Sequence, residues 1–469
     1  MKVTNNFVGQ GALLFIDQIL IAGTNWIFWL IISKLTDASE IGQATVIYSF
    51  ALLFATLAQL GLEYPLLKKS MSQGSSILVY ALAIETMITL ILVPILYFIV
   101  SSSINQSIAS AYTWIGVSLF VLTSIGFVAK FSLLGISDAR NVLIWDIMGT
   151  ASKFVLGIGL VYMGWGAFGI LVSFVIYSLV ITAATLALSL KKIGRREQKY
   201  IEWHWDELLQ VIREALMNTP AKFSRLVILS LSIVMLGFFG ISDAEIGIFY
   251  MTMMISIVIA SLASSISYTV IPASSQAKTD LTEGSLRIGL SFTSPLITAL
   301  AVAPAYILSL LGQEYTLGGA SLFMLSIGIL PSIIVMNSVS KFNNSNESQK
   351  IIVMGSIQVA AFLILFVVLV PAYGIFGAAV SIFIAYLASA LPPLIWFNRQ
   401  IRSFVLKSTM ATFSGILLGY GVLFWTNSAT IIIHPIIAIF ASVSLTIIIT
   451  LLLKNTTPTE IKNIIKSIK

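Results

Sequence analysis

Apolar runs of about 20 residues recur along the whole chain, and this recurrence constrains the fold more than any other feature. A helix rises about 1.5 Å per residue, so about 20 residues cross the hydrocarbon core of a bilayer. The sequence predicts an all-α polytopic membrane protein with about fourteen transmembrane helices. They lie at 12–33, 41–66, 77–101, 110–134, 142–163, 166–190, 220–240, 246–273, 286–311, 318–341, 351–371, 375–397, 404–426 and 430–453.

Composition excludes most other classes of protein. Of 469 residues, 58% are apolar and 10% are charged, against about 45–50% and about 25% in soluble domains. A soluble enzyme, a nucleic-acid-binding module and a disordered chain are excluded on this ground. The chain has no cysteine, which excludes disulfides, thiolate metal sites and a cysteine nucleophile. The first run is longer than a signal-peptide core of about 7–15 residues and lacks a cleavage pattern, so we interpret it as the first transmembrane helix.

Basic residues predict the orientation of the chain. With the N-terminus inside, the outer loops hold only Lys34, and both termini are cytoplasmic, as the positive-inside rule requires of a multi-pass protein of the cell membrane. The net charge of +7 is then explained by topology and by contact with anionic lipids, not by nucleic acid. The inner side carries Lys68, Lys69, Arg140, Lys191, Lys192, Arg195, Arg196, Lys199, Arg213, Lys278, Arg287, Lys350, Arg399, Arg402, Lys407, Lys454, Lys462, Lys466 and Lys469.

The segment 191–219 is the largest predicted extramembrane piece. Apolar side chains at helical spacing lie opposite Glu207, Gln210 and Glu214. The pattern predicts an amphipathic helix on the inner leaflet, serving as a linker. The apolar face comprises Trp205, Leu208, Leu209, Ile212 and Leu216.

Two short motifs recur at nearly equal offsets. Glu40-Ile41-Gly42 returns as Glu245-Ile246-Gly247, and Gly166-Ala167-Phe168-Gly169 returns as Gly374-Ile375-Phe376-Gly377, 205 and 208 positions later. Six spans bring the chain back to the same side, so the pattern predicts two parallel six-helix repeats, a transporter architecture. The predicted domains are an N-terminal lobe (1–190), a linker (191–219), a C-terminal lobe (220–397) and two further helices with a basic tail (398–469).

Ionisable residues within spans are candidates for function, because each costs about 2.5–3.5 kcal/mol at the centre of the bilayer. Lys153 is the deepest cation, near the middle of its span, and it shares a small and polar stripe with Asp146, Gly149, Thr150 and Gly157. Such a stripe lines either a cavity or a helix contact, and Lys153 could instead form a structural ion pair with Glu85 or Asp146. The in-span set also includes Asp17, Glu63 and Lys130 in the first half and Lys341 in the second; Glu63, Lys130 and Lys341 lie near the inner boundary and suit anchoring.

Motifs for enzymes are missing from the sequence. The match of Gly164 to Gly169 to a dinucleotide fingerprint joins two membrane helices and predicts a tight turn, because the fingerprint needs a preceding strand. Gly415 and Gly419 predict close helix packing. The two histidines, His204 and His434, lack metal-ligand neighbours at helical spacing. We therefore expect no catalytic residues, no metal site and no cofactor.

Several short segments together resemble polysaccharide transporters of the multidrug/oligosaccharidyl-lipid/polysaccharide (MOP) exporter superfamily, over essentially the whole chain. The resemblance is carried by Ser33-Lys34-Leu35, Glu40-Ile41-Gly42, Gln59-Leu60-Gly61-Leu62, Glu245-Ile246-Gly247 with Pro272, Leu311-Gly312-Gln313-Glu314-Tyr315, and the segment from Val370 to Ala379. The chain departs from the family in its seventh span, where many members carry an acid and Arg225 to Gly240 holds only Ser230 and Ser232.

The resemblance implies a MATE-like pair of lobes that open alternately and flip a lipid-linked oligosaccharide or polysaccharide precursor across the cytoplasmic membrane. An anionic polyprenyl-pyrophosphate head group requires a cation, for which Lys153 is the first candidate, with Lys222, Arg225 and Lys341 at the inner mouth. Asp17, Glu85 and Asp146 are the candidates to bind H⁺ or Na⁺ and couple its gradient.

Two alternatives remain open on the sequence. A MATE-type multidrug antiporter has the same lobes, but it usually has twelve helices and a cavity that favours cations. A membrane-bound polysaccharide polymerase or glycosyltransferase is the remote alternative, because such enzymes place catalytic acids on large outer loops, and the outer loops here are short.

Overall fold

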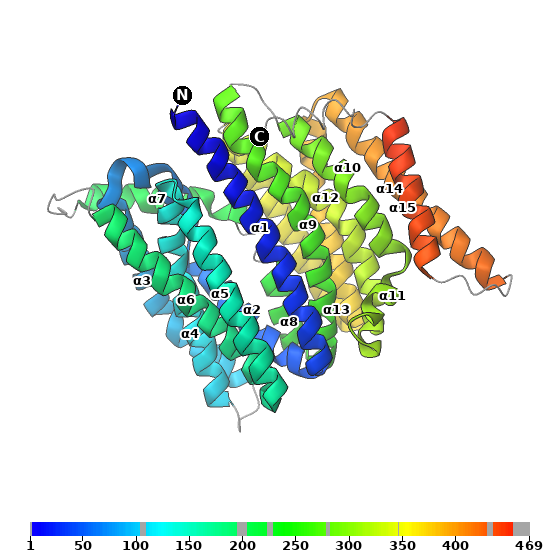
Figure 1. Cartoon of the computed structure of the whole chain (residues 1–469), viewed down its shortest axis with the longest axis horizontal. Helices are drawn as coiled ribbons and strands as arrows, with labels where there is room; N and C mark the ends of the chain where they lie inside the picture. The colour runs from blue at the N-terminus through cyan, green and yellow to red at the C-terminus, as the bar shows by residue number, and fades with distance from the viewer. Residues whose placement is uncertain are drawn as a thin grey trace. The chain divides into compact units, whose positions relative to one another are not determined.

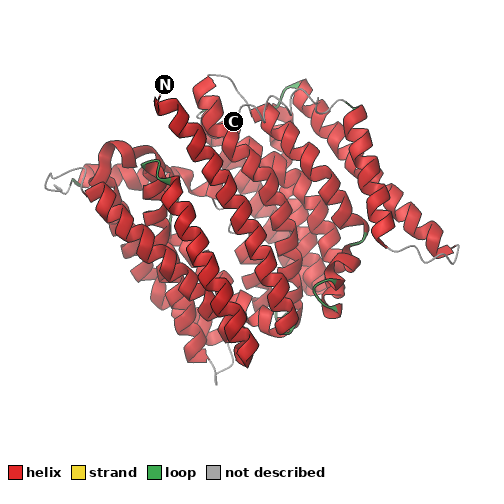
Figure 2. Ribbon diagram, in the orientation of Figure 1, coloured by secondary structure: helices red, strands yellow, loops and turns green. Residues whose placement is uncertain are grey.

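The structure is a computed structural model, and it describes residues 2–103, 109–194, 204–222, 228–277, 282–345, 347–428 and 435–453. Within these ranges every regular element is helical (Figure 2). The first seven α-helices are α1 (Lys2–Leu35), α2 (Ala38–Ala58), α3 (Glu63–Ser103), α4 (Ala109–Gly135), α5 (Ala139–Leu160), α6 (Gly166–Gly194) and α7 (Trp205–Lys222). They are followed by α8 (Ile228–Phe238), α9 (Asp243–Ala277), α10 (Thr282–Val302), α11 (Pro304–Ser309), α12 (Gly319–Asn344), α13 (Ser348–Trp396), α14 (Arg399–Ser428) and α15 (Pro435–Leu452) (Figure 1).

The helices match the apolar runs of the sequence and form a multi-pass membrane protein. Eight helical segments in the described ranges are long and apolar enough to cross a membrane, and three shorter apolar helices accompany them. Two of the eight, Ala139–Lys192 with 54 residues and Gln349–Trp396 with 48 residues, are each long enough for two crossings at about 1.5 Å per residue. The all-helical membrane fold is confirmed, and the exact count of fourteen spans stays a prediction.

The chain forms two compact units. Unit 1 comprises Met1–Trp26 and Ile248–Lys469, and unit 2 comprises Ile27–Gly247. Two helices, α1 and α9, therefore contribute residues to both units. The predicted division at 190, 219 and 397 follows the repeat and stays a prediction.

The repeat is visible in the backbone at two glycines. Gly166 has φ 46° and ψ −129°, and Gly374, 208 positions later, has φ 53° and ψ −134°. Both values of φ lie in the region that an L side chain disfavours. Each glycine sits at a sharp turn between two consecutive membrane helices, so the predicted tight turn is confirmed in both copies.

The repeated Glu-Ile-Gly motif makes a backbone contact within unit 2. A Cβ on Gly42 would overlap the carbonyl oxygen of Asp243, and a Cβ on Gly247 would overlap the carbonyl oxygen of Ala38. The two contacts are related by the same 205-residue offset as the motif itself. Gln43 Nε2 also donates to Asp243 Oδ2 at 3.1 Å. The first turns of α2 and α9 thus meet backbone to backbone, which explains glycine as the last residue of the motif.

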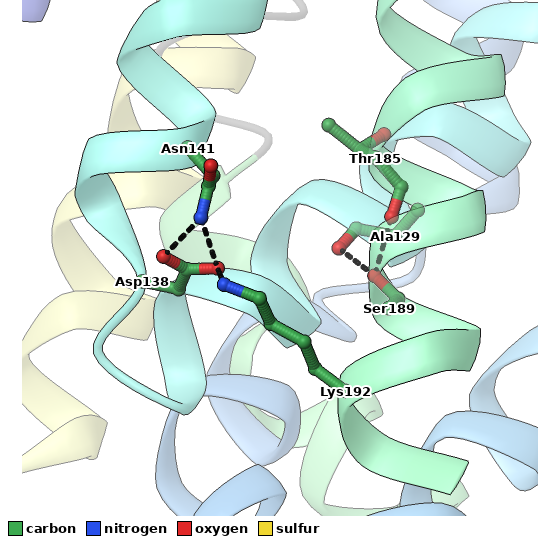
Figure 3. A network of polar contacts seen from close by, with 6 residues as sticks. All are labelled: Ala129, Asp138, Asn141, Thr185, Ser189 and Lys192. Carbon is green, nitrogen blue, oxygen red and sulfur yellow. Dashed lines mark hydrogen bonds and ion pairs between the residues drawn. The ribbon is translucent and has the colours of Figure 1, made fainter. Parts of the chain in front are cut away.

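Hydroxyl groups join α6 to α4 in unit 2. Thr182 Oγ1 donates to the carbonyl of Leu122 at 2.8 Å, and Ser189 Oγ donates to that of Ala129 at 2.9 Å. One end of this contact is held by Asp138, whose carboxylate accepts from Lys192 Nζ at 2.5 Å and from Asn141 Nδ2 at 2.8 Å (Figure 3). Small and hydroxylated residues let membrane helices approach closely, and these bonds fix the α4, α5 and α6 bundle.

In unit 1, α14 and α15 pack against α10 through small residues. A Cβ on Gly415 would overlap Thr446 Oγ1, and a Cβ on Gly419 would overlap Ser442 Oγ. The hydroxyls of Thr298 and Thr446 lie 3.1 Å apart. The prediction that Gly415 and Gly419 serve close helix packing is confirmed.

Candidate functional site

The predicted stripe on α5 is the buried face of that helix. Asp146, Gly149, Lys153 and Gly157 are buried, at helical spacing, and Thr150 is half-buried beside them. A Cβ added to Gly149 would lie within contact distance of side chains of α6. A Cβ added to Gly157 would lie 2.7 Å from Phe28 Cε2. The sequence left a cavity and a helix contact open, and the glycines show that this face makes a helix contact with α6 and α1.

Lys153 lies in this contact, within a cluster of aromatic rings. Its Nζ is 4.7 Å from the ring centroid of Phe28, 5.1 Å from that of Phe174 and 5.5 Å from that of Tyr177. The rings continue outward, because Tyr48 on α2 lies 4.4 Å from Phe174 between centroids. Rings from α1 and α6 therefore surround the ammonium group that α5 carries, and Tyr48 of α2 packs behind one of them.

These rings give a physical reason for a cation at this depth. The face of an aromatic ring carries negative charge, and a desolvated cation over it gains about 2 kcal/mol or more. Only 4% of Lys153 is exposed, so in this conformation the ammonium is shielded from any ligand of ordinary size. An anion can reach it only after side chains of α1 or α6 move.

Lys130 and Asp146 form an ion pair at 2.5 Å between Nζ and Oδ2. Asp146 is buried and Lys130 is about a quarter exposed. The sequence assigned Lys130 to anchoring and offered Asp146 as a partner of Lys153, and it missed this pair. The signal was available, because α4 and α5 are joined by a tight turn near residue 137 and the two residues stand at similar distances on either side of it.

The other two predicted coupling carboxylates are also buried. Glu85 lies on α3 in unit 2, with buried Thr89 one turn further along the same helix. Asp17 lies on the part of α1 that belongs to unit 1. Their roles in ion coupling stay predictions.

The remaining predicted cations are distributed unevenly. Lys341, near the end of α12, lies with its Nζ 5.1 Å from the ring centroid of Phe397. Arg225 falls outside the described residues, and Lys222 is the last residue of α7, with its side chain outside the described part. The grouping of Lys153, Lys222, Arg225 and Lys341 at one site therefore stays a prediction.

Metal-ligating side chains do not gather in the part of the chain that the structure describes: no group of three or more His, Asp or Glu there is placed to hold a metal ion. Helix α8, which covers most of the seventh predicted span, carries hydroxyl groups but no acid.

The sequence matches a protein family over most of its length. The family is described as polysaccharide biosynthesis protein, and its sequence model matches residues 31–317. The chain belongs to this family, as the motifs in the sequence predicted. No curated protein sequence matches the chain.

Solved structures with this fold are membrane exporters of the MOP superfamily. The lipid II flippase MurJ in an inward closed conformation is 14% identical, with 94% of this chain and 98% of that chain covered and a TM-score of 0.67. An inward-facing multidrug resistance MATE transporter of the MOP superfamily is 14% identical, with 83% of this chain and 98% of that chain covered and a TM-score of 0.57. A MATE structure in the bent conformation is 14% identical, with 87% of this chain and 99% of that chain covered and a TM-score of 0.57. At such identities the similarity establishes the fold.

Proposed function

We propose that this protein flips a lipid-linked oligosaccharide or polysaccharide precursor from the inner to the outer leaflet of the cytoplasmic membrane. Membership of the polysaccharide biosynthesis family is the observation that carries the proposal. A membrane-spanning member with the fold of a lipid II flippase suits the transfer of an assembled lipid-linked saccharide better than its synthesis. The protein is proposed to be a transporter, with no catalytic residue, cofactor or metal.

The buried cations provide the proposed binding groups for an anionic substrate. A polyprenyl-pyrophosphate head group is anionic, and moving it through a membrane requires compensating positive charge. Lys153 is held at mid-span without direct exposure, so we assign it to a state in which α1 and α6 have moved and the ammonium meets the head group. Lys341 is the proposed second contact, with Lys222 and Arg225 near the membrane boundary.

In this proposal, alternating access moves the substrate and an H⁺ or Na⁺ gradient supplies the driving force. Asp17, Glu85 and Asp146 are the proposed sites for H⁺ or Na⁺, and binding that differs between two conformations shifts their populations. Both termini are proposed to be cytoplasmic, with the basic loops against the anionic inner leaflet.

Reconstituted vesicles provide the test. The purified protein would be placed in vesicles containing a fluorescent polyprenyl-pyrophosphate saccharide. The fraction of the fluorescent label that a membrane-impermeant quencher reaches would be followed over time. We expect the accessible fraction to rise from about one half towards all of the label, because both leaflets exchange. Protein-free vesicles and vesicles with a heat-inactivated sample are the controls. An accessible fraction that stays at one half contradicts the proposal.

A second function is favoured by the structural similarity to MATE transporters, whose TM-scores reach 0.58. The same protein would then export a cationic drug in exchange for H⁺ or Na⁺. Vesicles loaded with a fluorescent lipophilic cation separate the two functions. Gradient-driven movement of the cation without any movement of the polyprenyl label would replace the flippase by the antiporter.

A further inference from the structure

Helix α7 carries two apolar faces, and only one of them is buried among the residues that the structure describes. At about 100° per residue, Leu208, Val211 and Ala215 share one face, and all three are buried in a cluster with residues of α3, α4 and α5. Trp205, Leu209 and Leu216 share a second face, about a quarter turn away, and they are 67%, 60% and 50% exposed. The sequence grouped Leu208 and Ile212 with the second face. The structure corrects this assignment, because Leu208 is buried in the docked cluster and Ile212 packs against it.

The docked face fixes α7 to unit 2 at three further points. Thr219 Oγ1 donates to the carbonyl of Leu60 at 2.8 Å, in the turn between α2 and α3. Lys69 Nζ lies 2.8 Å from Glu214 Oε1. The amide of His204 donates to the Tyr80 hydroxyl at 3.0 Å. The helix runs across the ends of its neighbours and not along them (Figure 1).

These contacts place α7 at the boundary of the membrane. The described part of the span within α3 begins at Ser76, and the span of α2 ends at Ala58. Leu60 lies two residues beyond the limit of α2, Lys69 lies about 10 Å before that of α3 at 1.5 Å per residue, and Tyr80 lies about one turn inside it. Exposed Leu67 on α3 and Leu190 at the end of α6 stand at the same boundary. The exposed apolar face of α7 thus lies at the same depth as the edge of the apolar surface that unit 2 presents to lipid.

The charged side chains of α7 lie on the side of the helix that would face away from a leaflet. The polar side of α7 holds Asp206, Glu207, Gln210, Arg213 and Glu214, roughly opposite the two apolar faces. Its three acids therefore point away from the apolar phase and from anionic head groups. A tryptophan at one end of an aliphatic stripe is the usual composition of a helix that lies in the interface.

We propose that the stripe of Trp205, Leu209 and Leu216 inserts into the acyl region of the adjoining leaflet, so that α7 is bound to the lobe by one face and to lipid by the other. Unit 2 is then tied to the leaflet at its boundary by a helix that does not cross it. The inference does not depend on which substrate the protein carries.

Single cysteines test the proposal directly, since the chain has none of its own. Full-length Leu209→Cys and Leu216→Cys would be spin-labelled in vesicles of phosphatidylethanolamine and phosphatidylglycerol. Asp206→Cys and Gln210→Cys, which are also exposed, are the matched controls on the polar side. Leu208→Cys reports the docked face. Asp206, Leu209 and Leu216 make no part of the docked contact, and Gln210 is connected to it only through its 3.1 Å hydrogen bond to Glu214, so we expect the fold of α7 to be retained.

Collisions with oxygen, which concentrates in lipid, and with a nickel chelate, which stays in water, distinguish the outcomes. We expect the ratio of oxygen to nickel accessibility to be several-fold higher at Leu209 and Leu216 than at Asp206 and Gln210. Equal ratios at all four positions would show the stripe in water and overturn the proposal. Low accessibility to both reagents at Leu209 and Leu216, as at Leu208, would show a protein partner or a second copy on the stripe and would overturn it as well.

Discussion

At the scale of single residues, substitutions of Lys153 distinguish a structural role of its ammonium group from a role in transport. Replacing it by methionine keeps an unbranched apolar stem among the aromatic rings and removes only the charge. If the ammonium serves the head group, Lys153→Met abolishes flipping and leaves the melting temperature of the purified protein within a few degrees of the parent, whereas Lys153→Arg keeps part of the activity. Flipping assays and thermal melts on the three proteins decide the matter.

The control for Lys153 is a change of the rings alone. Phe174→Leu keeps an apolar side chain of smaller volume and removes one aromatic ring from the ammonium, so it lowers stability and leaves the charge in place. A Lys153→Met protein that flips at the parental rate would contradict the proposed role.

The Lys130 and Asp146 pair gives a stability prediction. Removing one partner of a buried pair leaves a charge without compensation, at a cost of about 3–5 kcal/mol, and the partial exposure of Lys130 brings the expected loss to the low end or below. We expect Lys130→Met to lower the unfolding midpoint and Asp146→Asn, added to it, to restore most of the loss. Denaturant melts in detergent measure both, and additive effects of the two changes would refute the coupling.

At this scale the sequence identified which charges are buried, but not their partners. Hydropathy and spacing locate Lys153 and Asp146 on one face of a helix, since that depends on helical geometry alone. Which helix covers that face depends on packing between segments distant in sequence, such as Phe28 and Phe174. The aromatic cluster around the ammonium was therefore beyond a single-sequence prediction.

At the scale of elements, the contact between α2 and α9 depends on glycine. Because a Cβ at position 42 overlaps a backbone carbonyl and not a mobile side chain, Gly42→Ala requires the two helices to separate. We expect a loss of about 1–3 kcal/mol, as for other overpacked contacts, seen as a lower melting temperature.

Gly159→Ala on α5 is the matched control, because nothing lies within 4 Å of its added Cβ. Alanine favours a helix over glycine by about 0.5–1 kcal/mol, so this variant should melt at or above the parental temperature. A Gly42→Ala protein that behaves like Gly159→Ala would show that the contact is not a constraint.

The elements themselves were largely predictable. Runs of apolar residues and positive-φ glycines act locally, so helices and the turns at Gly166 and Gly374 follow from the sequence. Helix α7 was predicted as amphipathic, but its division into a docked face and an exposed face required the positions of α3 and the α2–α3 turn. The assignment of Leu208 failed for that reason.

At the scale of the whole molecule, charge predicts topology. Single cysteines at Ser103, Gly240 and Asn427 should react with a membrane-impermeant maleimide added to intact cells, and those at Ser72, Lys199 and Lys469 should react only after permeabilisation. The reason is that nearly all Lys and Arg lie in the loops of the second group. External labelling at Lys469 would contradict the even number of spans.

Ion coupling, if it drives transport, should require the buried carboxylates. A carboxylate taken out of water is costly to keep charged, and binding H⁺ or Na⁺ offsets that cost. Asp146 is already engaged by Lys130, so Asp17 and Glu85 are the favoured couplers. They lie in different compact units, so a conformational change between the units can alter the two sites separately and give the differential affinity that coupling needs. In vesicles with an imposed pH or sodium gradient, we expect Asp17→Asn with Glu85→Gln to abolish the gradient's effect on flipping while some flipping without a gradient persists. Each single change should show which of the two carries the larger share, and Asp146→Asn should show whether the third candidate carboxylate contributes at all. Full stimulation by the gradient in the double variant would remove both residues from the coupling site.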